Sequence, residues 1–370
     1  MSLIKDYDAT QALYRKCAEH DLVMARLGYA SQDEIYGIVK GAARFASEHG
    51  IRELPLGIFS TVGHYILQTL PRYLEAGHVL PSKGGDPAAY RRILFRNCRL
   101  ATAFMEILTD PADSDFGAVA VTHHYDHGHH TLPGGKRSED ELLCEPEFLD
   151  MFSSVMFDDT HSPFEENVAS SIEYRRFVEG TGRKKVMEGC LEEVAAGGQG
   201  LASSQATDPS QIEQYLARTG FELVVPNIGT ESIHAKAVGV QWGVLEAICE
   251  RGIGHRLVVH GFSSIRKLAV EEQRRLGALG VVGMNAYSYI PQHIGPQVLE
   301  RAARLVAARD AQKGYPIGFA DDGTPRYDTS GDANVFFAPL LDEVRDFRVG
   351  AIAGSVYEIL DNLGYARLSD

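Results

Sequence analysis

Apolar residues of this chain gather in short runs that longer amphipathic segments separate. Short runs rich in β-branched and apolar residues are typical of buried strands. Eight runs meet this description: Leu22–Leu27, Leu54–Phe59, Ala118–His124, Ser153–Asp158, Lys184–Gly189, Phe221–Ile228, Arg256–Gly261 and Val281–Ser288. Segments with helical apolar spacing lie between them, for example Gln32–His49, Ala88–Leu108, Phe164–Glu179, Val240–Arg251, Ile265–Leu279 and Pro296–Ala308. The pattern therefore predicts strands and helices in nearly regular alternation.

This alternation predicts parallel strands, because each helix carries the chain back to the start of the next strand. Eight such units allow the sheet to close on itself, which leaves no strand edge exposed. We therefore expect an α/β fold of the (β/α)8 TIM-barrel type, with an open doubly wound sheet as the alternative. The sequence has no Gly-x-Gly-x-x-Gly turn after the first run and no P-loop, which disfavours the open sheet.

We expect residues 1–370 to form a single domain, because no low-complexity linker divides the chain. The barrel core is expected over about residues 20–310, and a C-terminal loop and helical tail over residues 311–370. The stretch Gln312–Asn334 is rich in turn-forming residues and predicts an exposed loop before the tail.

Charge and cysteine content disfavour several classes of function. The chain carries 36 basic and 50 acidic residues, a net charge of −14 that repels phosphate backbones and anionic lipids. Its five cysteines include no Cys-x-x-Cys pair, so neither a disulfide framework nor a thiolate zinc site is encoded. No secretory or membrane-spanning apolar stretch is present in the sequence. We therefore expect a cytoplasmic protein without nucleic-acid or membrane partners.

The segment with the highest density of histidines is Thr122–His130, in which five histidines surround Asp126. Imidazoles are common metal ligands, and the carboxyl ends of barrel strands face the active-site mouth. Composition alone fits a solvated histidine-rich loop equally well. His234 and His260 lie at comparable places after the sixth run and at the end of the seventh. Three imidazoles from such loops leave a fourth position open for water or substrate, the pattern of a catalytic zinc site.

Carboxylates and small polar residues accompany these histidines. Besides Asp126, the candidate acids are Asp158 after the fourth run and Glu188, Glu192 and Glu193 in or after the fifth. Near a divalent cation, such a carboxylate serves as a base, as a group that orients a metal ligand, or as a ligand itself. Away from a cation, each of these acids is an ordinary solvated side chain. The segment from Gly261 to Ser264 opens a predicted helix, which favours an anion site or, alternatively, a plain N-cap.

Together these motifs resemble the class II, metal-dependent fructose-bisphosphate aldolase family, in the same order along about Leu22–Ala308. The likeness rests on His124-Tyr125-Asp126-His127-Gly128, on the segment SVMFD…SPFEENV, on Gly229-Thr230 with His234, on LVVHG with His260, and on Asn285.

The resemblance implies roles for these residues. His127, His234 and His260 would be the metal ligands, usually of Zn2+ or another divalent transition metal. Asp126 would shuttle the proton at the cleaved carbon–carbon bond. Substrate phosphate would be held by Gly261, Ser263, Asn285 and Ser288. We also expect His124 and Asp158 to support the ligands from behind.

Departures from the family pattern bear on the substrate. The family has acids after a Gly-Gly pair in the loop after the fifth strand, whereas here Gln199 and Gly200 follow Gly197-Gly198. We therefore expect Glu192 to supply the second acid–base group, with Glu193 or a base from another loop as the alternatives. The family's arginine for a second phosphate is also missing from the tail, which predicts a substrate other than fructose 1,6-bisphosphate.

The expected function is that of a metal-dependent aldolase, a lyase. It would cleave or form a carbon–carbon bond of a ketose phosphate, or of a related polyhydroxy ketone, through a metal-stabilised enediolate. Two alternatives stay open: an isomerase, epimerase or biosynthetic aldol condensation on the same chemistry, and a non-catalytic barrel subunit of an aldolase complex. The resemblance further implies a homodimer or homotetramer.

Overall fold

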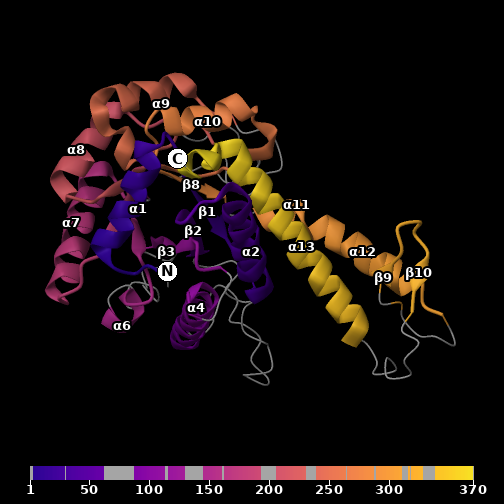
Figure 1. Cartoon of the computed structure of the whole chain (residues 1–370). Helices are drawn as coiled ribbons and strands as arrows, with labels where there is room; N and C mark the ends of the chain where they lie inside the picture. The colour runs from indigo at the N-terminus through magenta and orange to yellow at the C-terminus, as the bar shows by residue number, and fades with distance from the viewer. Residues whose placement is uncertain are drawn as a thin grey trace.

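The structure is a computed structural model of the chain (Figure 1). It describes residues 3–29, 31–61, 87–112, 116–129, 145–160, 162–192, 206–230, 239–263, 265–286, 289–310, 316, 318–327 and 338–369.

Eight parallel strands form the centre of the fold, in the order β6-β5-β4-β3-β2-β1-β8-β7. They are β1 (Met24–Gly28), β2 (Leu54–Thr61), β3 (Val119–His129), β4 (Ser154–Asp158), β5 (Val186–Cys190), β6 (Leu223–Val225), β7 (Val258–Val259) and β8 (Gly283–Ala286). An isolated parallel bridge joins Val224 of β6 to Leu257 beside β7. Because the two end strands meet there, the sheet is a nearly closed barrel. The predicted (β/α)8 fold is confirmed, and the open-sheet alternative is wrong.

Helices surround this barrel and alternate with its strands (Figure 1). They are α1 (Tyr7–Glu19), α2 (Gln32–His49), α4 (Pro87–Thr109), α6 (Pro146–Leu149), α7 (Phe164–Gly180), α8 (Pro209–Thr219), α9 (Trp242–Ile248), α10 (Val270–Ala278), α11 (Tyr289–His293), α12 (Gly295–Ala307) and α13 (Ala338–Leu363). A π-helical turn, Cys249–Ile253, continues α9, and a 3-10 turn, Ile265–Lys267, precedes α10. None of the described helices combines the length and the apolarity needed to cross a membrane.

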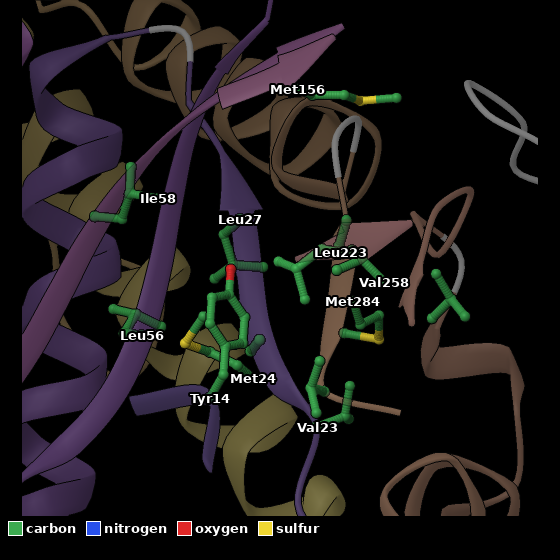
Figure 2. Packing of buried hydrophobic residues seen from close by; sticks show 14 of the residues in the cluster. Tyr14, Val23, Met24, Leu27, Leu56, Ile58, Met156, Leu223, Val258 and Met284 are labelled. Carbon is green, nitrogen blue, oxygen red and sulfur yellow. The ribbon is translucent and has the colours of Figure 1, made fainter. Parts of the chain in front are cut away.

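Buried apolar side chains pack around the strands of the barrel. Strands β1, β4 and β5 are buried along their whole length, as expected when both faces of a parallel sheet are covered. In Figure 2, Tyr14 of α1 points into the cluster to which Met24, Leu27 and Leu56 belong. In barrels of this kind the polar groups of a site lie at the carboxyl ends of the strands.

The C-terminal tail packs on the barrel through α13, which lies along α2 (Figure 1). Gly41 of α2 permits the close approach, because a Cβ there would lie 2.4 Å from the carbonyl oxygen of Ala353. Within the predicted loop Gln312–Asn334, β9 (Gly318–Phe319) and β10 (Pro325–Arg326) form a short antiparallel hairpin.

Candidate metal centre

The histidine-rich motif lies within a strand. Strand β3 extends to His129 and pairs with β2 as far as Thr61 and Asp126. This corrects the prediction that the strand ends at His124 and that the motif follows in a loop. The longer strand forms because its main-chain groups keep parallel partners on both β2 and β4.

A bulge in β3 turns two neighbouring residues into the same site. The pairing of β3 with β4 shifts between Tyr125 and Gly128, and His127 has a φ of 51°. A regular strand would point Asp126 and His127 to opposite faces, whereas a bulge breaks this alternation. The left-handed conformation is rare outside glycine, and such strained residues cluster at functional sites.

Asp126, His127 and His260 converge at this end of the barrel, with ligand atoms all within 4.8 Å of one another. His260 directly follows β7, and its ring lies nearly perpendicular to that of His127 with the ring centroids 5.1 Å apart. Asp126 and His260 are buried, whereas the side chain of His127 is 29% exposed. Two imidazoles and a carboxylate form a donor set that fits a divalent transition metal. The third predicted ligand, His234, lies outside the described residues.

Asp158 orients His127 from behind. Its Oδ2 lies 2.7 Å from His127 Nδ1, so that Nδ1–H donates to the carboxylate and Nε2 is left for the centre. Burial alone would lower the pKa of His127, but the charges of Asp126 and Asp158 raise it to about 9. The structure thus places Asp158 where the sequence analysis expected a supporting acid.

Asp126 is held between polar groups from several strands. Asn285 of β8 donates from Nδ2 to Asp126 Oδ1 at 2.8 Å, and the same Nδ2 lies 2.9 Å from His260 Nε2. His124 Nε2 lies 3.6 Å from Asp126 Oδ1. Burial alone would raise the pKa of Asp126, but the neighbouring His127, His260 and His124 lower it to about 2. Asp126 is therefore a carboxylate at neutral pH.

A buried ion pair lies beside these residues, and the sequence analysis missed one of its members. Arg26 Nη1 lies 2.6 Å from Glu188 Oε2, and both side chains are fully buried. The other oxygen, Glu188 Oε1, accepts from His260 Nε2 at 3.2 Å. Glu188 had been named among the acids, whereas Arg26 had not been considered. Its signal was a single arginine inside the apolar run Leu22–Leu27.

Two residues predicted to bind phosphate, Gly261 and Ser263, lie in the segment that directly follows His260. Gly261 has a φ of 79°, and the next residue, Phe262, donates its N–H to the carbonyl of Asn285 at 3.3 Å. Ser263 is buried, and its carbonyl oxygen accepts from the His293 ring. Ser288 lies outside the described residues.

Glu192 stands apart from the converging donors. Its carboxylate accepts a hydrogen bond from Thr207, and burial raises its pKa. It belongs to neither of the two groups of metal-ligating side chains found in the described part of the chain. Its alternative, Glu193, and the Gly197–Gly200 segment lie outside the described residues.

Comparison with known proteins identifies the family. Residues 65–318, more than half of the chain, match the family described as fructose-bisphosphate aldolase class-II. The chain belongs to this class II aldolase family.

Curated relatives agree with this membership, and a solved structure shares the fold. A fructose-bisphosphate aldolase of Streptococcus pyogenes is 26% identical over 266 residues, which cover 70% of this chain and 77% of the relative. A D-tagatose-1,6-bisphosphate aldolase subunit GatY of Klebsiella oxytoca is 36% identical over 141 residues, 36% of this chain and 46% of the relative. The structure of a fructose-bisphosphate aldolase from Campylobacter jejuni superposes with a TM-score of 0.65 at 17% identity and covers 97% of this chain and 96% of that one.

Membership confirms the predicted family and the aldolase class of function. Class II aldolases are lyases, generally depend on a divalent metal and act on sugar phosphates. The Asp126, His127 and His260 group of this class II aldolase is consistent with that dependence.

Proposed function

We propose that the protein is a zinc-dependent aldolase that cleaves or forms a carbon–carbon bond of a ketose phosphate or a related polyhydroxy ketone other than fructose 1,6-bisphosphate. The observation that carries the proposal is the bulge of β3, which brings Asp126 and His127 together with His260 although neighbours on a regular strand would diverge. A scaffold subunit has no need of this arrangement, which favours an enzyme.

The ion would be held by His127 and His260, with His234 as the third ligand. When bound, it supplies the positive charge that stabilises the negative charge developing on the ketone fragment as the bond breaks. Asp158 keeps the His127 ring in the tautomer that a ligand requires. His124, which Ser154 holds at 2.8 Å through Nδ1, lines the same interior.

Asp126 is the group that takes and returns the proton of the substrate hydroxyl at the cleaved bond. Its low pKa keeps it ready to accept at neutral pH, and the hydrogen bond from Asn285 fixes the orientation of the carboxylate. Because Asn285 contacts Asp126 and His260, we assign it to the reacting end of the substrate as well as to the phosphate. Gly261, Ser263 and Ser288 are assigned to the phosphate.

Glu192 is the second acid–base group of the proposal. Burial raises its pKa above the ordinary value of a glutamate, which makes it a better proton acceptor, and Thr207 orients its carboxylate. Its place after β5 corresponds to the loop in which the family carries its acids.

The remaining features of the proposal concern the whole molecule. We propose a single domain, because α13 of the tail packs directly on α2 of the barrel. We also propose a cytoplasmic homodimer or homotetramer. Light scattering of the purified protein measures the number of subunits.

The test uses Asp126→Asn, with Asp321→Asn on the exposed hairpin as the matched control. Ketose phosphates are screened for cleavage, and products are identified by NMR so that fragments are distinguished from a rearranged ketose. We expect Asp126→Asn to lower kcat by about 10²–10⁴-fold with bound zinc unchanged, and Asp321→Asn to leave kcat unchanged. Wild-type turnover in Asp126→Asn would refute the assignment.

A further inference from the structure

Arg26 occupies the interior of the barrel, a place where charged side chains are rare. It lies in the middle of β1, in register with Gly57 of β2 and Asn285 of β8. Glycine at position 57 makes room for it, because a Cβ there would lie 2.3 Å from Arg26 Cγ. The position is thus built to hold a long side chain.

The ion pair of Arg26 spans the barrel. The strand order places three strands between β1 and β5 on either side, so Arg26 and Glu188 reach each other across the interior. Among the described residues, Nε and Nη2 of Arg26 have no hydrogen-bond partner. The guanidinium is therefore directed at one carboxylate, that of Glu188.

Glu188 also belongs to a second set of metal-ligating side chains. His124, Asp126 and Glu188 are all buried, and their ligand atoms lie within 4.8 Å of one another. This deep group shares Asp126 with the outer group of Asp126, His127 and His260. Two buried carboxylates and an imidazole would attract a cation of their own if no positive charge were present. His124 Nε2, with no hydrogen-bond partner in the described part of the chain, points into this group.

We propose that Arg26 is a positioning residue of the metal centre: it supplies the positive charge of the deep group and thereby confines the divalent ion to the outer group. The proposal rests on the proposed metal-dependent function. Arg26 binds Oε2 of Glu188 and leaves Oε1 to contact His260 and His124, so the acid holds both imidazoles in place. A second divalent ion would have to approach a fixed guanidinium in a dry interior, where like charges repel strongly.

The experiment counts metal ions. Wild type, Arg26→Met, Arg26→Lys and the double variant Arg26→Met/Glu188→Gln are dialysed against buffered zinc, and bound zinc per chain is measured by plasma mass spectrometry. Arg44→Met removes an arginine from an exposed pair with Glu48 and is the matched control. We expect one ion per chain in wild type, Arg26→Lys, Arg44→Met and the double variant, and two in Arg26→Met.

A second measurement needs no variant. Cobalt is titrated into the metal-free wild-type protein, and its visible absorption is recorded. We expect one spectrum that saturates at one equivalent, whereas a second phase with a different spectrum would overturn the proposal even if Arg26→Met did not fold. One ion in Arg26→Met, or two in the wild type, would also overturn it and leave the proposed function intact. Wild-type protein that binds no ion would instead contradict the metal-dependent function itself.

Discussion

The substitution Gly41→Ala changes the free energy of unfolding in two opposite ways. Higher helix propensity within α2 stabilises the protein, whereas a clash between α2 and α13 destabilises it. Gly41 lies inside α2 with helical geometry, and alanine is the better helix former by about 1 kcal/mol. The local effect alone would stabilise the protein. However, the added Cβ would meet the carbonyl oxygen of Ala353 at 2.4 Å and its Cα at 2.9 Å.

The size of this destabilisation depends on which atoms the added Cβ contacts. The clashing atoms are main-chain atoms of α13, so no side-chain rotation relieves the contact. Ordinary contact requires α13 to move away from α2 by about 1 Å, which loosens the buried Ile352 and Val356 beside it. Overpacking of this kind costs about 1–3 kcal/mol. After subtraction of the gain in helix propensity, we expect a net loss of about 1–2 kcal/mol.

The assay compares Gly41→Ala with Gly350→Ala in urea and thermal unfolding, followed by circular dichroism. Gly350 is an exposed glycine of α13 where an added Cβ meets nothing within 4 Å. In a chain of this size, we expect Gly41→Ala to lower Tm by about 2 °C and Gly350→Ala to raise it by about 1 °C. If Gly41→Ala stabilises the protein as Gly350→Ala does, the close packing of α13 on α2 is refuted.

Two further predictions concern charge and metal. Lys185 is buried and donates to the carbonyl of Phe152 at 2.7 Å, and burial lowers its pKa from 10.5 to about 8. Between pH 8 and 10.5 the Lys185 side chain is therefore protonated in the unfolded chain and deprotonated in the folded one, so this residue adds up to about 3 kcal/mol to the free energy of unfolding as the pH rises. Urea unfolding should show that the free energy of unfolding of wild type rises over this pH range relative to that of Lys185→Met, and parallel pH profiles of the two proteins would contradict it. Removal of metal by a chelator should lower the Tm of wild type reversibly, because an ion at 100 times its Kd contributes about 2.7 kcal/mol to the free energy of unfolding. The variant His127→Ala/His260→Ala should show no such change. A wild-type Tm that does not respond to the chelator would argue against a bound ion.

The strands could be predicted because the apolar character that burial requires is visible within each short segment of sequence. A parallel strand buried on both faces must be apolar along its length, so each of the eight runs is visible without knowledge of its neighbours. The number of runs then limits the topology, since eight parallel strands close and remove both edges.

The sequence predicted which residue types form the candidate site, but it predicted only part of their spatial arrangement. Asp126, His127 and His260 do meet, and Asp158 supports His127, although their roles stay predictions. Asn285 donates a hydrogen bond to Asp126, a contact that the sequence did not predict, and its expected role in phosphate binding stays a prediction. A residue's partner across the barrel depends on the register and tilt of all strands between them, which no local pattern contains.

The sequence by itself determined the eight barrel strands, the family and the histidine-rich motif, because hydrophobic periodicity and short motifs are properties of neighbouring residues. Only the tertiary structure decided that the motif lies on a bulged strand, that Gly57 makes room for Arg26, and that Arg26 pairs with Glu188. Arg26 and Glu188 are 162 positions apart in the sequence. No local pattern therefore explains a charged residue at either position, because the two side chains meet only when the barrel closes. Closure removes both side chains from water, and in that dry interior the charge of each side chain stabilises the charge of the other.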